Sequence, residues 1–503
     1  MGKNVVYIGF NNEYTLIADY LKERHDWDPV FFSCQGKTLQ WAKEYYPNAV
    51  THDEMSMRQA NFDYSKIGQP VPIDAGIIDA ISKYELSCLN MLEDTTGRNY
   101  SFYERRRYYY EIIKYWNTVI HKLKPDIYVC DAWPHTVTDY VLYLLCKYCY
   151  SIPTVFIDPV IHFNDSNVIG ISMEDMAAPF YDIYNSQEQI DIPPDVSAFL
   201  DNLRGKKASP PDYIKESYEK LERKEKFQLR ELMRLIILTL VRGEGFRKVP
   251  VAYKKNEKPF ESSDSRMNWF EHFWFIDSLR RKNRRLKKIY TPLCSQPDFG
   301  MKYIYFAAPY QPEASNCPNA RLYEDLFLVL DILSSSLPSG WVIYYKEHPG
   351  IFCGGIRGSL SRDRHFYEKI ASYPNVEMIP IEIDTFKLID GSQAVASVSG
   401  TVSWEAAVRG KPSLFFGNVW YQGCRSLFKV NTYQDCIEAI EKISDGYTPD
   451  QKDIERYVSA IKQVAVKGMR HRNWAARINE CEDIKFEMEK IGRALHEAYI
   501  RHY

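Results

Sequence analysis

Short apolar runs alternate with longer helical patterns over the first 165 residues of the chain. Four of these runs stand out, at Val5–Phe10, Pro29–Ser33, Asp126–Cys130 and Pro153–Ile157. Continuous apolar runs of this length, bounded by polar loops, are typical of parallel strands that are buried on both faces. Helical patterns lie between them, most clearly from Tyr100 to Lys122. Strand, helix and strand in succession predict a Rossmann-like domain at 1–165.

The alternation stops at 166–300 and returns at 301–480. Paired prolines and charged helix-forming runs such as Glu216–Arg234 predict a helical, partly basic insert at 166–300. Residues 481–503 predict a closing amphipathic helix. We therefore expect an α/β protein with two Rossmann-like domains that face a cleft. The strands expected in the second domain are Tyr303–Phe306, Trp341–Tyr345, Val376–Ile379, Ala394–Val398 and Ser413–Phe416.

Composition excludes several classes of protein. Hydrophobic residues make up 45% of the 503 residues, which excludes a disordered chain, and the net charge of -2 gives no general attraction to nucleic acid. The 11 cysteines are scattered, which favours reduced thiols, and the Cys146–Cys149 C-x-x-C lies in an apolar helical run that predicts core packing rather than zinc binding. No apolar run approaches the ~30 Å of a bilayer, so we expect a cytoplasmic protein without a transmembrane segment.

One segment departs from this neutral balance. Arg280–Lys288 carries seven basic residues and no acidic residue. A solvated helix face is the simpler interpretation, because charge runs are usually solvated. Peripheral contact with an anionic membrane, or with an anionic polysaccharide, is the functional alternative.

Polar residues follow the expected strands of the second domain, where an open parallel sheet binds its ligands. Ser399, Gly400, Thr401 and Ser403 place three hydroxyls around one glycine directly after a strand, a pattern that favours a phosphate site, although Ser/Thr capping of the next helix is the alternative. Glu405 would accept from ribose hydroxyls or take part in the cap. The other candidates for nucleotide binding are Gln311, Glu313, Lys346, His348 and Pro349.

Aromatic residues make up 15% of the chain, and four of them lie in or beside these loops. We expect the four to stack on cytosine or on a sugar ring. They are Tyr310, Trp404, Trp420 and Tyr421.

The same motifs resemble those of bacterial capsule polysaccharide biosynthesis proteins, the family of 3-deoxy-manno-octulosonate (Kdo) and related nonulosonate CMP-sugar transferases. The match rests on Tyr310–Ser315, Tyr345–Pro349, Ser399–Ala406 and shorter pieces from Gly410 to Tyr421, and it covers a little under half of the chain. The resemblance implies a GT-B glycosyltransferase with no cofactor and no metal. Its C-terminal domain would hold the CMP-sugar, with His348 and Pro349 at the CMP moiety and the Ser399–Ser403 hydroxyls at its phosphate.

Transfer from such a donor needs a base, or a carboxylate nucleophile, from the opposite domain. Asp131 and His135, after the strand Asp126–Cys130, are the candidates, followed by Glu13 after the first strand. Helix capping by Asp131 and a structural role for His135 are the simpler interpretations. The expected partners are the CMP-activated sugar and a glycan, glycolipid or protein acceptor, and no nucleic acid. A CDP-glycerol or CDP-ribitol phosphotransferase and a non-enzymatic polymer-assembly protein remain alternatives.

Overall fold

The computed structural model describes most of the chain, and every statement below concerns these residues alone. The described residues are 2–58, 61–96, 101–163, 166–172, 180–186, 190–205, 233, 237, 269–311, 316–353, 358, 361–464, 466–467 and 483–503.

The N-terminal domain is built on a seven-stranded sheet in the order β13-β6-β5-β4-β1-β2-β3. The strands from β1 to β5 run parallel, and β6 and β13 extend the sheet in antiparallel fashion. Two strands of this sheet come from outside the expected range 1–165. The strand β6 belongs to the segment expected as the insert, and β13 belongs to the segment expected as the second domain. The strands are β1 (Lys3–Ile8), β2 (Trp27–Cys34), β3 (Val50–Asp53), β4 (Ile127–Cys130), β5 (Thr154–Phe163), β6 (Ser166–Ser172) and β13 (Val466–Lys467).

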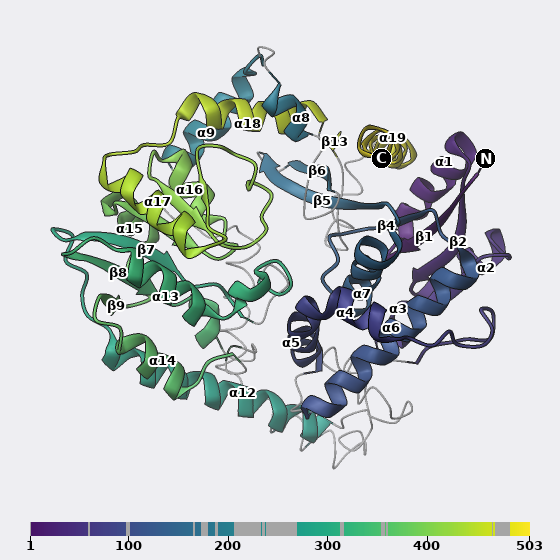
Figure 1. The fold of residues 1–503 in the computed structure, drawn as a ribbon, viewed down its shortest axis with the longest axis horizontal. Coiled ribbons are helices and arrows are strands. Elements are labelled where there is room, and N and C mark those ends of the chain that lie inside the picture. Colours follow the sequence, from purple (N-terminus) through teal and green to yellow (C-terminus); the bar gives the residue numbers. More distant parts are fainter. Residues whose placement is uncertain are drawn as a thin grey trace.

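Helices cover both faces of this sheet (Figure 1). The longest, α6, begins with a capping box between Ser101 and Glu104, and its buried face packs on the sheet and on α7, where Trp116 Nε1 donates to the Thr138 carbonyl at 2.8 Å. The helices are η1 (Asn12–Tyr14), α1 (Thr15–His25), α2 (Gly36–Tyr45), α3 (Glu54–Arg58), α4 (Ala75–Ile81), η2 (Ser82–Tyr84), α5 (Glu85–Thr96), α6 (Phe102–Leu123), α7 (Val137–Leu145) and the π-helical turn η3 (Cys146–Tyr150).

The C-terminal domain holds a six-stranded, fully parallel sheet in the order β12-β11-β10-β7-β8-β9. Its strands are β7 (Lys302–Ala307), β8 (Trp341–Lys346), β9 (Val376–Met378), β10 (Ala394–Ser397), β11 (Ser413–Phe415) and β12 (Phe428–Lys429). Its helices are η8 (Arg321–Glu324), α13 (Leu326–Ser336), η9 (Pro349–Phe352), α14 (Arg364–Ala371), α15 (Thr385–Gly391), α16 (Val402–Val408), α17 (Tyr433–Ser444) and α18 (Gln451–Val464).

Both sheets have the same Rossmann-like strand order. In the N-terminal sheet, β2 and β3 follow β1 on one side, and β4 pairs with the other side of β1. In the C-terminal sheet, β8 and β9 follow β7 on one side, and β10 pairs with the other side of β7. Figure 1 shows the two resulting α/β lobes. The expectation of an α/β protein with two Rossmann-like domains is confirmed. The reversal of strand order also marks one ligand-binding edge in each domain.

Four described elements connect the domains: α8 (Phe180–Asn185), α9 (Pro194–Gly205), α12 (Trp269–Tyr290) and η7 (Thr291–Leu293). The helices α8 and α9 pack on α18, and α12 packs on η9 and α14 of the C-terminal domain. Residues 206–232 lie outside the described residues, so the helix expected over Glu216–Arg234 stays a prediction except at Met233.

The expected closing helix is present as α19 (Ile484–His502). It returns to the N-terminal domain and packs against α1, where a Cβ on Gly492 would lie 2.6 Å from the Tyr20 ring. Three buried apolar side chains fix its inner face: Met488, Ile491 and Leu495.

Two stacked histidines join α19 to the end of α1. The rings of His25 and His496 lie 3.5 Å apart between centroids, and burial, followed for His25 by the neighbouring His496 and Arg24, lowers the pKa of both. A histidine whose folded pKa lies below its unfolded value of about 6.5 stabilises the fold above that pH and loses this contribution as the pH falls.

We therefore expect the melting temperature of the wild type to fall between pH 7.5 and pH 5 by several degrees more than that of His496→Gln. Thermal melts across this range measure the difference. The exposed His365→Gln on α14 is the matched control and should follow the wild type. Parallel curves for His496→Gln and the wild type would contradict the expectation.

Cys146 is buried and Cys149 half-buried, both as free thiols in the turn η3, in agreement with core packing. No helix in the described ranges is long and apolar enough to cross a membrane. Within the same ranges, no group of three or more His, Cys, Asp or Glu residues is placed to hold a metal ion.

Candidate functional site

The candidate nucleotide site lies at the carboxyl edge of the C-terminal sheet, where the loops after β7, β8 and β10 meet. Neighbouring strands are about 4.8 Å apart, so the loops after β8 and β10, which flank β7, are separated by about 10 Å. A nucleotide spans a comparable distance. One ligand can therefore contact both loops.

The loop after β10 presents unused hydrogen-bond donors. The backbone N–H groups of Ser399, Gly400 and Thr401, and the Ser399 hydroxyl, make no hydrogen bond within the described part of the chain. Two hydrogen bonds hold the Gly400 carbonyl in place: it accepts from Tyr421 Oη at 2.6 Å and from Ser397 Oγ at 3.2 Å. The loop is thus held in place while its donors remain available to an anion.

Gly400 has no structural reason to be glycine. Its φ is not in the left-handed region, and a Cβ built there would meet its nearest atoms at 3.6 and 3.7 Å, which is ordinary van der Waals contact. A glycine at this position would allow a ligand to approach the backbone closely.

Ser403 and Glu405 occupy different environments from Ser399. Ser403 is fully buried, and its hydroxyl bonds to Ser397 Oγ at 2.8 Å and donates to the Leu414 carbonyl at 3.0 Å, so it fastens α16 to the sheet. The structure therefore indicates a structural role for Ser403 in place of the expected contact with the phosphate. Glu405 is half-buried and accepts from the exposed Thr401 hydroxyl at 3.4 Å. Thr401 is the N-cap of α16 and makes no side-chain cap hydrogen bond, so the capping interpretation is not supported, and the ribose role stays a prediction.

Ser399→Ala and Ser403→Ala are a matched pair of variants. We expect Ser399→Ala to change the free energy of unfolding by less than about 0.5 kcal/mol and to weaken CMP binding about 10- to 100-fold, the loss of one hydrogen bond to a charged group. Ser403→Ala should instead cost about 1–3 kcal/mol of stability, because the hydroxyl is buried and bonded twice. Urea unfolding and calorimetric titration with CMP measure the two quantities. Equal CMP affinity in Ser399→Ala and the wild type would remove Ser399 from the site.

The loop after β8 holds His348 in a defined tautomer. Burial lowers the pKa of His348, so the ring is neutral near pH 7, and Nδ1 accepts from the Gly350 N–H at 3.1 Å. The proton is therefore on Nε2. No described residue accepts it, and the Tyr310 ring lies 5.6 Å away between centroids. His348 is thus positioned to donate to a phosphate or to a base carbonyl.

The neighbours of His348 have structural roles. The buried Lys346 ammonium donates to the Ile383 carbonyl and, at 3.0 Å, to Thr385 Oγ1, and burial lowers its pKa to about 8. It fastens the loop before α15 and has no described contact with the Ser399 loop. Pro349 is exposed and begins η9, where its missing N–H is not required.

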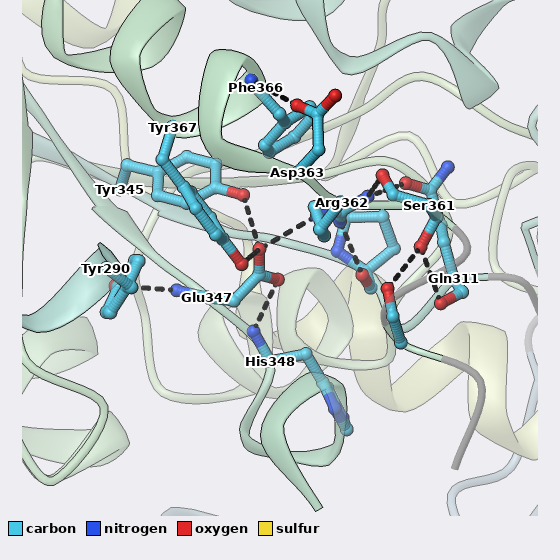
Figure 2. A network of polar contacts seen from close by, with 12 residues as sticks. Tyr290, Gln311, Tyr345, Glu347, His348, Ser361, Arg362, Asp363, Phe366 and Tyr367 are labelled. Carbon is cyan, nitrogen blue, oxygen red and sulfur yellow. Dashed lines mark hydrogen bonds and ion pairs between the residues drawn. The ribbon is translucent and has the colours of Figure 1, made fainter. Parts of the chain in front are cut away.

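A buried carboxylate, Glu347, sets the position of this loop (Figure 2). Its Oε2 accepts from Tyr345 Oη at 3.0 Å, from Tyr367 Oη at 3.1 Å and from Arg362 Nε at 2.8 Å. Its Oε1 accepts from the His348 backbone N–H at 2.9 Å. The orientation of His348 therefore depends directly on Glu347.

Arg362 joins the loops after β7 and β8. Besides Glu347, its guanidinium donates to Gln311 Oε1 at 2.6 Å and to the Pro309 carbonyl at 3.3 Å. The Arg362 side chain is 1% exposed and that of Glu347 is 0% exposed, so the ion pair is fully desolvated. Figure 2 shows these groups converging from β8, α14 and the loop after β7.

The pKa shifts of this cluster favour a charged Arg362 and protonated tyrosine hydroxyls. Burial is the largest influence on the pKa of Arg362 and would lower it, but Glu347, Tyr345 and Tyr367 together outweigh burial, so the pKa is raised. Burial, followed by Glu347, raises the pKa of Tyr345 and Tyr367, so both hydroxyls remain donors. Nothing local in the sequence marks Arg362, which lies 15 residues beyond its partner.

Gln311, expected at the nucleotide, is instead part of this cluster, because Nε2 donates to the Glu324 carbonyl at 2.7 Å and Oε1 accepts from Arg362. Glu313 lies outside the described residues, and its role stays a prediction.

Three of the four aromatic residues expected to stack on the ligand are core residues. Trp404 and Tyr421 are buried and Trp420 is half-buried; Trp404 and Trp420 pack against Tyr457 of α18, and Tyr421 packs against both tryptophans. Their proximity in the motif reflects this core. Tyr310, beside His348, is the one of the four that keeps the expected position.

In the N-terminal domain, Asp131 lies at the carboxyl edge between β1 and β4. A Cβ on Gly9, which has φ +76°, would lie 2.1 Å from Asp131 Oδ1, so the carboxylate rests against the glycine backbone. The cap of α7 is Thr136, whose hydroxyl accepts from the Asp139 N–H, and not Asp131. The capping interpretation of Asp131 is therefore wrong, and a role at the ligand edge remains open to it.

The other two candidates differ from Asp131 in setting. His135 is exposed, and its Nδ1 bonds to the Trp133 carbonyl at 2.9 Å. Glu13 is half-buried in η1, in the loop after β1. Both follow strands that meet at the reversal point, as expected.

Asp139 is a carboxyl group that the sequence did not single out. It lies in the first turn of α7, where it is buried, and its Oδ1 accepts from Thr138 Oγ1 at 3.2 Å. Burial raises the pKa of Asp139 to about 6, although Arg58 acts in the opposite direction. A carboxyl group with this pKa at the ligand edge is suited to proton transfer.

No family model matches the chain, and no curated protein matches it. Solved structures that match are KpsC β-Kdo 2,7 transferase of Thermosulfurimonas dismutans (14% identity, 39% of this chain and 69% of that chain, TM-score 0.20) and KpsC β-Kdo 2,4 transferase of the same organism (12%, 67% and 87%, 0.23). UDP-GlcNAc 2-epimerase of Methanocaldococcus jannaschii also matches (13%, 92% and 99%, 0.23). At these TM-scores the matches carry no argument about function, and the fold class rests on the strand order of the two sheets.

Proposed function

We propose that the protein is a glycosyltransferase that moves a 2-keto acidic sugar, Kdo or a related nonulosonate, from a CMP-activated donor to a hydroxyl group of a surface glycan or similar acceptor. The observation that carries the proposal is the pair of loops at the C-terminal sheet edge. One presents the unused donors of 399–401, and the other presents the Nε2–H of His348. The motif resemblance supplies the choice of CMP.

Each group has a role in this reaction. The N–H groups and hydroxyl of the Ser399 loop, with His348, would bind the phosphate and stabilise the charge that develops on it as CMP leaves. The bond between the anomeric carbon and the phosphate oxygen breaks as the acceptor oxygen attacks, and a carboxylate accepts the acceptor proton. Asp131 is the proposed carboxylate, in the opposite domain.

A donor screen tests the proposal directly. The full-length protein is titrated with CMP, CDP and UDP, and then assayed for consumption of CMP-Kdo, a CMP-sialic acid and CDP-glycerol. Preferential binding of CMP and release of CMP from a CMP-sugar support the proposal. Turnover of CDP-glycerol would favour a phosphotransferase, and the absence of any nucleotide response would favour a non-enzymatic role.

Gly400→Ala tests the phosphate contact by sterics alone. Because the chain itself leaves room for the Cβ, we expect an unchanged melting temperature together with at least a tenfold loss of CMP affinity. Gly410→Ala is the matched control: with φ +78° it should cost about 1 kcal/mol of stability and leave CMP affinity unchanged. Retained CMP affinity in Gly400→Ala would contradict close approach of the phosphate to this backbone.

A further inference from the structure

One side of α12 is fixed to the C-terminal domain. Leu279, Asn283, Leu286 and Tyr290 are buried, and they recur at the three- and four-residue spacing of one helix face. Asn283 Nδ2 donates to the Cys353 carbonyl at 2.6 Å, and Tyr290 Oη donates to the Ile379 carbonyl at 2.6 Å. The orientation of the helix about its axis is therefore determined.

The opposite side of α12 carries exposed positive charge. Arg280 is turned inward, and the other six basic residues of the segment are exposed: Arg281, Lys282, Arg284, Arg285, Lys287 and Lys288. Arg281 pairs with Asp277 at 2.9 Å and Lys287 with Glu382 at 3.3 Å, and the other four make no ion pair with described residues. Since successive residues of a helix are about 100° apart, Arg281, Arg284, Arg285 and Lys288 share one outward stripe about 100° wide.

An exposed tryptophan continues the same stripe. Trp274 is seven residues before Arg281, so it lies on the same side of the helix, and its side chain is 54% exposed. The Arg281 guanidinium lies 6.0 Å from the centroid of its ring. Tryptophan has an apolar ring with one polar N–H, which favours the boundary between water and lipid headgroups.

We infer that this face of α12 docks the protein on the surface of an anionic lipid bilayer. The net charge of -2 excludes a general electrostatic attraction, so the attraction has to be local. The helix is about 33 Å long and lies at the margin of the molecule in the view of Figure 1. Cations in a row with a tryptophan fit a charged plane, and the stripe holds one acidic residue, Asp277, and no amide side chain that would hydrogen-bond the hydroxyls of a sugar polymer.

Vesicle co-sedimentation of the full chain tests the inference. We expect binding to phosphatidylcholine vesicles that contain 30% phosphatidylglycerol, none to pure phosphatidylcholine, and loss of binding as salt is raised. The double variant Arg284→Gln/Arg285→Gln should bind about 30-fold more weakly, because each basic residue near an anionic surface contributes about fivefold. Trp274→Ser should weaken binding without altering its salt dependence.

Two matched variants complete the design. Arg284→Lys/Arg285→Lys keeps the charge and should bind as the wild type does. Lys442→Gln/Lys452→Gln removes two exposed cations from α17 and α18 and should also have no effect. Failure of the wild type to bind anionic vesicles, an equal loss in the Lys442/Lys452 variant, or binding to a soluble polyanion such as heparin in preference to vesicles would each overturn the inference.

Discussion

Arg362→Met should lower the free energy of unfolding by about 3–5 kcal/mol, because it leaves the Glu347 carboxylate buried without its cation. The same change releases Gln311 and Pro309, so the loops after β7 and β8 lose their common anchor. We therefore expect CMP affinity to fall more than tenfold in the protein that remains folded. Urea unfolding measures the first effect, and calorimetry at low temperature measures the second.

Two further variants separate the roles of charge and geometry. Arg362→Lys keeps the positive charge but cannot reach three acceptors at once, so it should recover part of the stability and little of the CMP affinity. Arg364→Gln, two residues further along at the start of α14, is the matched control: its ion pair with Glu368 is exposed, and its loss should cost less than about 0.5 kcal/mol. Wild-type stability in Arg362→Met would show that the ion pair does not hold these loops.

Asp131→Asn should reduce kcat about 10²- to 10⁴-fold while CMP affinity stays within twofold of the wild type. The amide of asparagine has the shape of the carboxylate and keeps its packing against Gly9, but it cannot take up a proton from the acceptor hydroxyl. Steady-state kinetics with the donor identified by the screen measure kcat, and CMP titration measures affinity. Asp28→Asn, which removes one partner of an exposed pair with Lys22, is the matched control and should have wild-type kinetics.

Gly9→Ala tests the same carboxylate by displacing it. A Cβ at this position would overlap Asp131 Oδ1, so kcat should fall with CMP affinity retained, and the left-handed φ adds a loss of stability. If Asp131→Asn has full turnover, the base lies elsewhere. Asp139→Asn then becomes decisive, because loss of a kinetic pKa near 6 would identify that residue.

The strands that were predictable from sequence are those with a continuous apolar run, and most of them are central strands, although the edge strand β9 was also predicted. Continuous apolar runs mark β1, β4 and β7, and the structure places them at the centre of each sheet. The edge strand β3 reads Val50-Thr-His-Asp, with half of its side chains only partly buried, and β12 has two residues, so neither has an apolar run to detect.

The residues of the candidate site were predictable where a single loop presents them directly after a strand. They were not predictable where the contacts join residues from three different segments. Ser399, Gly400 and His348 follow strands directly, and their position at the sheet edge follows from strand order. Glu347 and Arg362 meet only because the loop after β8 and the segment before α14 lie side by side in the fold. Ser403 was predicted at the phosphate because its hydroxyl cannot be told from that of Ser399 in a sequence motif, whereas α16 directs the Ser403 hydroxyl toward the sheet.

The return of α19 to the N-terminal domain has a consequence for synthesis of the chain. The apolar side chains of Ile17, Ala18 and Leu21 share a core cluster with Met488, Ile491 and Leu495. At about 5–20 residues per second, roughly 300 residues and tens of seconds separate the end of β6 from the emergence of α19 at the ribosome. The first domain to be made is therefore completed by a helix made much later, and its uncovered face is the part of the nascent protein that we expect chaperones to bind.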